Sequence, residues 1–304
     1  MAMSVTKQRG FTLIELIVVM VVTGIIAASI VVFFKPAFNI YIAVGRRAGL
    51  TDLADTALRR MSRDIRLAVP NSIRSPNSQC FELVPTAAGG RYRVGPDTIW
   101  DSANPAAPSK WFDGTAAVTD LDVLTQLPPE LLTPAPGDYW LVIDNQNTND
   151  VYAGTNRAAI QSVATPPPLN PSLGYHRITL QAATQFPSGY DGGRFLAVPN
   201  AQNAVFYVCA GAGSPPWVDA EGSGTGTLYR FANYGYNAAT PAACPVPVVG
   251  TTPVLASKVK SCRFDYSPTQ GATQQSGFVW MKLEIAEQNE PIVMVHGTHV
   301  DNVP

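Results

Sequence analysis

Charged side chains are scarce in this chain of 304 residues, and their scarcity limits what the protein can be. Asp, Glu, Lys and Arg make up 14% of the residues, against about 25% in typical soluble domains. Residues 71–304 carry twelve Lys/Arg against eighteen Asp/Glu, a balance of −6. We expect no nucleic-acid partner, because proteins that bind nucleic acid present a clustered basic face.

Catalytic and metal-binding motifs are also missing from the sequence. No Gly-x-Ser-x-Gly occurs, and the glycine-rich run at 222–226 precedes a strand pattern instead of the helix of a dinucleotide site. His296 and His299 lack the glutamate and helical context of a zinc motif. The oxygen-rich run Asp144–Asp150 lacks the central glycine and distal glutamate of a calcium loop, so it predicts a turn. We therefore expect no enzyme, no metal and no cofactor.

Cysteines are few, and their spacing excludes a compact zinc site. Cys80, Cys209, Cys244 and Cys262 are separated by 129, 35 and 18 positions. Two disulfides in an oxidising compartment are the expected arrangement. Three pairings are possible. We favour Cys209–Cys244, because these residues flank a predicted strand at 227–231, which leaves Cys80–Cys262.

The chain has one long hydrophobic run, and it follows a basic leader. Lys7 and Arg9 precede Gly10, and the apolar run from Phe11 to Phe34 then carries a single acidic residue, Glu15. These 24 residues are enough to cross a ~30 Å hydrocarbon core, and they exceed the apolar stretch of an ordinary cleaved signal. The basic leader predicts a cytoplasmic N-terminus, and a carboxylate inside a membrane span usually marks function.

Helical periodicity continues beyond the apolar run. Apolar positions recur at spacings of three and four at Leu50, Leu53, Ala54, Ala57, Leu58, Met61, Ile65 and Ala68. We expect one helix over about 11–68, kinked at Pro36 and ended by Val69-Pro70. Arg59, Arg60, Arg63 and Arg66, with Asp64, lie between the apolar positions; they could contact neighbouring helices or form local ion pairs, and both readings stay open.

The sequence pattern changes at residue 71, where short β-rich runs begin to alternate with turn residues. Strands are predicted at 81–84, 98–100, 138–143, 175–180, 205–209, 227–231, 263–266, 277–285 and 291–296, with surface loops at 103–109, 166–168 and 210–226. No second strong helix is indicated. The expected fold class is α+β: a leader (1–10), a transmembrane half-helix (11–34), an amphipathic stem (35–70) and an antiparallel β-rich domain (71–304) on which the stem packs.

The junction Gly10-Phe11-Thr12-Leu13-Ile14-Glu15 resembles the class III signal of type IV pilins and pseudopilins. In that family a prepilin peptidase cuts after the glycine and methylates the new N-terminus. The resemblance implies cleavage between Gly10 and Phe11, N-methylated Phe11 and a long helix that stays in the mature protein. It also implies that Glu15 neutralises the α-amine of an adjacent subunit; pairing with its own amine is the local alternative.

Other segments narrow the resemblance. The run from Leu53 to Arg74, then Thr227–Phe231, Cys262–Tyr266 and His299–Pro304, look like MshO-type proteins, minor pilin-like components of the mannose-sensitive haemagglutinin (MSHA) pilus system. The similarity covers both ends of the chain and shades into the J-type minor pseudopilins of type II secretion. The family fold is a helical stem on β-sheets, so the implied architecture is pilin-like.

The resemblance implies a structural subunit in the bacterial inner membrane, with its C-terminal domain in the periplasm, which then enters a pilus fibre near the tip. Its expected partners are other minor and major pilin-like subunits, the prepilin peptidase and the inner-membrane assembly platform. A rival from another class is a membrane-tethered adhesin or ligand-binding module that uses the loops at 103–136 and 210–226.

The first prediction concerns processing. In cells with an active prepilin peptidase, the mature chain should begin at N-methylated Phe11, which intact-mass measurement of membrane-extracted protein can establish. A chain that starts near residue 29, or that keeps residues 1–10, would contradict it.

Overall fold

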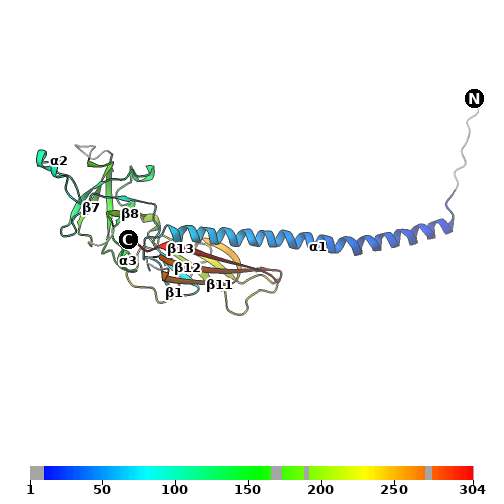
Figure 1. Ribbon diagram of the computed structural model, residues 1–304. Helices are drawn as coiled ribbons and strands as arrows, with labels where there is room; N and C mark the ends of the chain where they lie inside the picture. Colours follow the sequence, from blue (N-terminus) through cyan, green and yellow to red (C-terminus); the bar gives the residue numbers. More distant parts are fainter. Residues whose placement is uncertain (1–9, 166–172, 188–191, 271–275, 304) are drawn as a thin grey trace, which may run out of the picture. The chain divides into compact units, whose positions relative to one another are not determined.

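A computed structural model describes residues 10–165, 173–187, 192–270 and 276–303 (Figure 1). Lys7 and Arg9 of the leader and the proline run at 166–168 lie outside the described residues. The chain divides into two compact units, residues 1–49 and 50–304, each with its own character.

One long helix, α1, extends from Leu13 to Arg66 and belongs partly to each unit (Figure 1). It is two residues shorter at each end than expected, and it continues through Pro36. After the helix, the N–H of Val69 donates to the carbonyl of Val84 at 2.8 Å, so the chain enters β structure directly before Pro70. No residue between Gly10 and Gly49 is buried. This first unit is therefore a helix without a protein core of its own.

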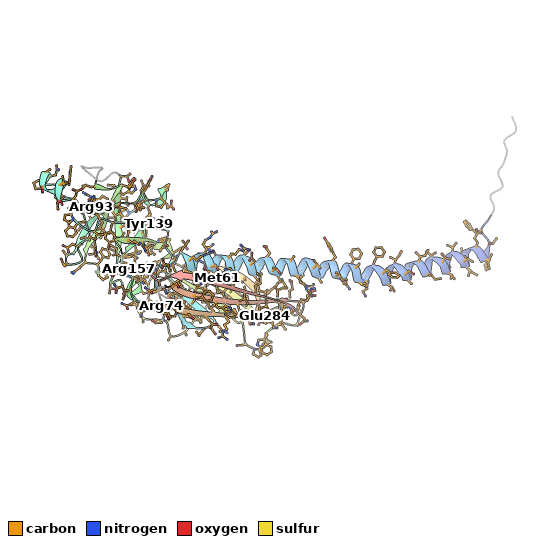
Figure 2. All side chains as sticks on the ribbon, viewed as in Figure 1. Met61, Arg74, Arg93, Tyr139, Arg157 and Glu284 are labelled. Atoms are coloured by element: carbon orange, nitrogen blue, oxygen red, sulfur yellow. A yellow bond between two sulfur atoms is a disulfide. The ribbon has the colours of Figure 1, made fainter. Side chains whose placement is uncertain are left out.

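The second unit contains a seven-stranded antiparallel sheet in the order β1-β2-β9-β10-β11-β12-β13. The strands are β1 Arg74–Asn77, β2 Cys80–Leu83, β9 Val205–Ala210, β10 Gly226–Phe231, β11 Val254–Gln270, β12 Ser276–Glu287 and β13 Glu290–Asp301. Burial alternates along β12, as expected for a strand with one face on a core. Figure 2 labels Met61, on the part of α1 that belongs to this core, and Glu284 of β12, which alternates with the buried residues Leu283 and Ile285.

A second, six-stranded sheet has the order β3-β8-β5-β6-β7-β4. Its strands are β3 Ala88–Arg91, β8 Arg194–Pro199, β5 Tyr139–Val142, β6 Arg157–Ala164, β7 His176–Thr184 and β4 Val118–Val123. A bridge between Tyr92 and Val123 joins the ends β3 and β4. The N–H of Arg93 donates to the Asp122 carbonyl at 2.9 Å beside it. The sheet thus closes on itself around buried aromatic and aliphatic side chains that include Phe112 and Phe195.

The stem portion of α1 supplies one wall of the main core. Leu50, Ala54, Ala57, Leu58, Met61 and Ile65 are buried in a cluster with side chains of β2, β9, β10, β11, β12 and β13. Leu53 packs at its margin. These positions recur at helical spacing on one face, so the predicted amphipathic stripe and its packing on an antiparallel sheet are confirmed. The expected α+β fold class is therefore confirmed too.

Polar contacts join the end of the stem to the six-stranded sheet. Asn145 donates from Nδ2 to the Pro70 carbonyl at 2.6 Å, and Asn71 donates from Nδ2 to the Asn145 carbonyl at 2.9 Å. The Tyr152 hydroxyl donates to the Ser72 carbonyl at 2.9 Å. A small apolar cluster that includes Val69 and Tyr152 surrounds these bonds. Residues 69–72 are thus fixed to both sheets.

Residues 232–253 form neither helix nor strand. They pack on the face of β2 and β9 opposite the stem, where Cys244 lies against Cys80, Phe206 and Val208. A disulfide between Cys80 and Cys244 attaches this segment to β2. Beneath it, Glu82 and Arg74 form a fully buried ion pair at 2.6 Å. The Tyr234 hydroxyl donates to the other Glu82 oxygen at 2.6 Å. Buried charges are tolerated when paired and hydrogen-bonded in this way.

The predicted disulfide pairing is wrong. The structure joins Cys80 to Cys244 and Cys209 to Cys262. Strand β10 begins only at Gly226, which pairs with Val259, and β11 continues past that point to lie against the chain that follows β9. The N–H of Gly213 donates to the Lys260 carbonyl at 3.0 Å there. A short middle strand therefore brings Cys209 and Cys262 together, with their Cα atoms 6.5 Å apart.

Eight of the nine predicted strands are confirmed within β2, β5, β7, β9, β10, β11, β12 and β13. The expected strand at 98–100 is wrong, because this segment begins the short helix α2, Thr98–Ala103. Asp97 caps it by accepting a hydrogen bond from the Trp100 N–H at 3.0 Å. One further turn of helix, α3, covers Asp150–Ala153. The 3₁₀ turns are Pro129–Leu131 and Asn200–Gln202.

The second prediction tests the stem packing. Leu58 is 2% exposed, so Leu58→Asp places an unpaired charge in the core and should unfold or aggregate the chain. Arg63, on the exposed side of the same helix, is the matched site: Arg63→Asp should change the free energy of unfolding by no more than about 0.5 kcal/mol. Thermal melts of both variants in detergent decide it. A Leu58→Asp melt like that of the parent would mean that the stem does not pack on the sheet.

Candidate processing and assembly site

The start of α1 presents the predicted processing junction in an open position. Gly10 is exposed, and Phe11 has 84% of its surface exposed. Both residues precede the first helical residue, Leu13. A peptidase that must bind an extended peptide would find this junction outside the helix.

Thr12 and Glu15 form the first turn of the helix together. The N–H of Glu15 donates to Thr12 Oγ1 at 3.3 Å, and the N–H of Leu16 donates to the Thr12 carbonyl at 3.2 Å. Thr12 is therefore the N-cap, and Thr-x-x-Glu is the sequence of a capping box. The Thr-x-x-Glu spacing is visible in the chain, and by itself it predicts this cap. Glu15 thus suits a local role in the helix cap, besides the assembly role that the resemblance implies.

The first half of α1 exposes apolar side chains on every side. Exposed fractions of the large apolar residues from Phe11 to Phe34 run from 47% at Ile17 to 84% at Phe11. The hydroxyls of Thr23 and Ser29 donate to carbonyls one turn earlier, Val19 and Ile25, so neither needs water. Among the described residues, α1 is the one helix long and apolar enough to cross a membrane. A helix that is apolar all round suits lipid or a bundle of other helices.

The fold defines a class of protein in which an apolar N-terminal helix continues as the stem of an antiparallel β domain. Residues 5–31 match the family model of the prokaryotic N-terminal methylation motif. The matched range includes Gly10, Phe11 and Glu15. No curated protein matches the chain, and no solved structure matches it. The motif supports a pilin or pseudopilin relationship and, with the apolar helix, fits a membrane-anchored protein that interacts with other pilins and with the prepilin peptidase.

A hydrogen-bonded group of polar side chains lies where the stem meets the sheet. Asp64 is 8% exposed and faces β9 and β10. Its Oδ2 accepts hydrogen bonds from the Tyr207 hydroxyl at 2.6 Å and from Arg230 Nη2 at 2.9 Å and Nε at 3.0 Å. Arg230 also donates to Gln202 at 2.8 Å. This network fixes the last turns of the stem to the sheet through directional, charge-assisted hydrogen bonds. Apolar packing alone does not provide such orientation.

The network has electrostatic consequences for its members. Burial, and then the neighbouring Asp64 carboxylate, raise the pKa of Tyr207 well above its ordinary value of 10.0. For Arg230, burial lowers the pKa, but Tyr207 and Asp64 outweigh it and the net shift is upward. At neutral pH Tyr207 is therefore a neutral phenol and Arg230 a guanidinium.

The sequence left two interpretations of the stem arginines open, contacts with neighbouring helices or local ion pairs, and the arginines divide between them. Arg59 pairs with Asp55 at 2.5 Å, one turn away, with 75% of its side chain exposed. Arg60 lies 3.6 Å from Asp64. Arg63 and Arg66 are exposed. Local ion pairs thus explain two of the four arginines, whereas Asp64 is turned to the sheet and is not available to a neighbouring stem.

The remaining candidates form no binding site among the described residues. His296 and His299 lie in β13, where the His299 ring packs 5.0 Å from that of Phe278. In the segment Asp144–Asp150, which connects β5 to β6, Asn145 Oδ1 accepts from the Val151 N–H at 2.9 Å, and Asp150 Oδ2 accepts from the Asn147 N–H at 3.0 Å. The described part of the chain holds no group of three or more His, Cys, Asp or Glu side chains that could bind a metal ion.

The third prediction tests the stem–sheet network. Asp64→Ala leaves Arg230 and Tyr207 without their shared acceptor and should lower the free energy of unfolding by about 3 kcal/mol. The matched variant is Asp55→Ala on the same helix, whose ion pair with Arg59 is exposed; it should cost about 0.5 kcal/mol or less. Denaturant melts of the two variants should differ accordingly, and equal losses would show that Asp64 contributes no more than a surface charge.

Proposed function

We propose that this chain is a minor pilin-like structural subunit, of the MshO type, that helps to assemble a type IV pilus of the MSHA kind near the fibre tip. The observation that carries the proposal is the methylation motif on a helix whose apolar half has no protein core and whose second half carries a β domain. The subunit does no catalysis: its work is to be held in the membrane, extracted and packed against other helices.

In this proposal the prepilin peptidase cuts between Gly10 and Phe11, and the inner-membrane assembly platform moves the mature chain into the fibre. The N-terminus starts in the cytoplasm, and the β domain lies in the periplasm. Glu15 is the one charged residue from Phe11 to Phe34. In a helical bundle its carboxylate would offset the protonated α-amine of a neighbouring subunit, since buried charges are tolerated in pairs.

The second candidate in the same class is a J-type minor pseudopilin of type II secretion, which would use the same anchor and stem. For the adhesin alternative, the loops at 103–136 and 210–226 were the proposed binding surface. Residues 118–123 of the first segment form β4 of the six-stranded sheet, whereas the second connects β9 to β10 of the other sheet. The two segments therefore belong to different sheets, and the architecture favours the subunit proposal.

The fourth prediction separates the charge of Glu15 from its place in the helix cap. Glu15→Gln keeps a side chain suited to a capping box but removes the charge. We expect at least about a tenfold fall in the amount of the chain in sheared fibres, because an unpaired buried amine costs about 3–5 kcal/mol. Glu15→Val should behave alike, with membrane insertion and the β domain intact.

The matched control is Thr12→Ala, which weakens the cap by about 1 kcal/mol and leaves the charge in place. It should enter fibres at close to the parental level. Immunoblots of fibre and membrane fractions after shearing give the result. Normal incorporation of Glu15→Gln would refute the pairing role, and a parental chain that never leaves the membrane fraction would refute the subunit proposal.

A further inference from the structure

Strand β13 forms one end of the seven-stranded sheet, and it is long and regular. Its twelve residues, Glu290–Asp301, pair one for one with β12 from Glu287–Glu290 to Ser276–Asp301. No bulge interrupts that register. An end strand of this kind presents a row of backbone N–H and C=O groups that no sheet neighbour uses.

The hairpin turn shows which groups point outward. Gln288 and Asn289 have φ values of 51° and 63°, as in the two-residue turn that favours tight hairpins. In such a hairpin the flanking residues, Glu287 and Glu290, exchange ladder bonds, and the pattern then alternates along the strand. Residues 292, 294, 296, 298 and 300 therefore bond to β12. Val293, Val295 and Gly297 direct their N–H and C=O groups away from the sheet, as does the carbonyl of Pro291, whose missing N–H suits an outward position.

The outward row is uncharged and uninterrupted. From Pro291 to Val300 the strand contains no Asp, Glu, Lys or Arg. Val293 and Val295 are 52% and 54% exposed. A side chain at Gly297 would collide with the ring of Phe278, which lies over it from β12. No hydrogen bond from the described part of the chain reaches the outward groups of Val293, Val295 or Gly297.

The other sheet ends of the second unit are protected in the ways that proteins ordinarily use. Strand β1 has four residues, contains Pro76 and pairs irregularly with β2. Strands β3 and β4 meet each other through the Tyr92–Val123 bridge, so the six-stranded sheet leaves neither end open there. Within the same unit, β1, β3 and β4 are thus protected at the sheet ends, whereas β13 is not. This difference indicates that the long uncharged edge of β13 is kept for pairing with another strand.

We propose that β13 is an assembly edge, to which an extended, uncharged strand of a different subunit adds as an eighth strand of the sheet. The inference rests on the proposed function as a fibre subunit. Backbone hydrogen bonds from Val293, Val295 and Gly297 supply the attraction. β-Branched or aromatic side chains on the added strand would pack beside Val293 and Val295.

A second copy of this chain does not fit the edge in a membrane. The N–H of Asn71 donates to Asn302 Oδ1 at 3.2 Å, so the C-terminal end of β13 lies at the C-terminal end of the stem. Symmetric antiparallel pairing of two β13 strands would therefore point the two stems in opposite directions. Two chains anchored through α1 in one membrane need stems that point the same way. The occupant is accordingly a strand of another pilin-like subunit.

The test uses the full chain in pilus-producing cells. Val295→Pro removes one outward N–H and no ladder bond to β12, and Pro291 already occupies an equivalent outward position on the strand. The matched variant Val295→Thr keeps the N–H and the β-branched shape. We expect Val295→Pro to melt within a few degrees of the parent and to be present in the membrane at the parental level. Its amount in sheared fibres should fall at least about tenfold, or ~1.4 kcal/mol, whereas Val295→Thr should enter normally.

Hydrogen exchange of the unmodified chain gives a readout that does not depend on how a variant folds. The amides of Val293, Val295 and Gly297 should exchange freely in the detergent-extracted monomer and at least about 100-fold more slowly in sheared fibres. A chain that enters fibres without this protection, or normal entry of Val295→Pro, would overturn the edge proposal and leave the subunit proposal standing. Protection in a detergent-stable homodimer would overturn the choice of partner. Absence of the unmodified chain from fibres would overturn both proposals.

Discussion

The rest of the structure depends on the packing of one helical face against one sheet. Leu50, Ala54, Leu58, Met61 and Ile65 repeat at helical spacing and are buried against side chains of six strands. Burial of the Leu, Met and Ile side chains among them stabilises the fold by about 1.5–3 kcal/mol each. Without this packing the sheet would expose an apolar face to water, and the apolar stripe of the stem would have no partner. The Asp64 network adds orientation to this contact, because three hydrogen bonds to one carboxylate oxygen fix how the helix is turned.

This division of α1 into two kinds of surface connects structure to function. Residues 10–48, the described part of the chain before Gly49, have no buried side chain, so their free energy depends on lipid or on other helices. The residues after it have a core of their own. A subunit built in this way can exchange a lipid environment for a helical bundle while its β domain stays unchanged. The methylation motif at residues 5–31 belongs to the part of the chain that would make that exchange.

Much of this architecture could be predicted from the sequence, and the failures have physical causes. The long helix and its stripe follow from spacing alone, and eight of the thirteen described strands follow from β-rich runs bounded by turn residues. Strands β1, β3, β4, β6 and β8 were missed. Two of them, β3 at Ala88–Arg91 and β6 at Arg157–Ala164, are rich in glycine or alanine, which carry little strand signal. The expected strand at 98–100 was wrong because the Asp97 cap outweighed the β propensity of Thr98 and Ile99. Local patterns do not reveal long-range contacts: Asp64 meets Arg230 across 166 positions, and the disulfide partners depend on where β10 begins.

The two-surface description of α1 is tested most directly by attaching a spin label at successive positions of the helix in lipid bilayers. All four native cysteines are in disulfides, so an introduced thiol is labelled alone. Positions 13–34 should be accessible to oxygen on every side of the helix. Positions 50–66 should show mobility with a period of about 3.6 residues and minima at Leu50, Ala54, Leu58, Met61 and Ile65. Uniform mobility over 50–66, or water accessibility over 13–34, would contradict the account.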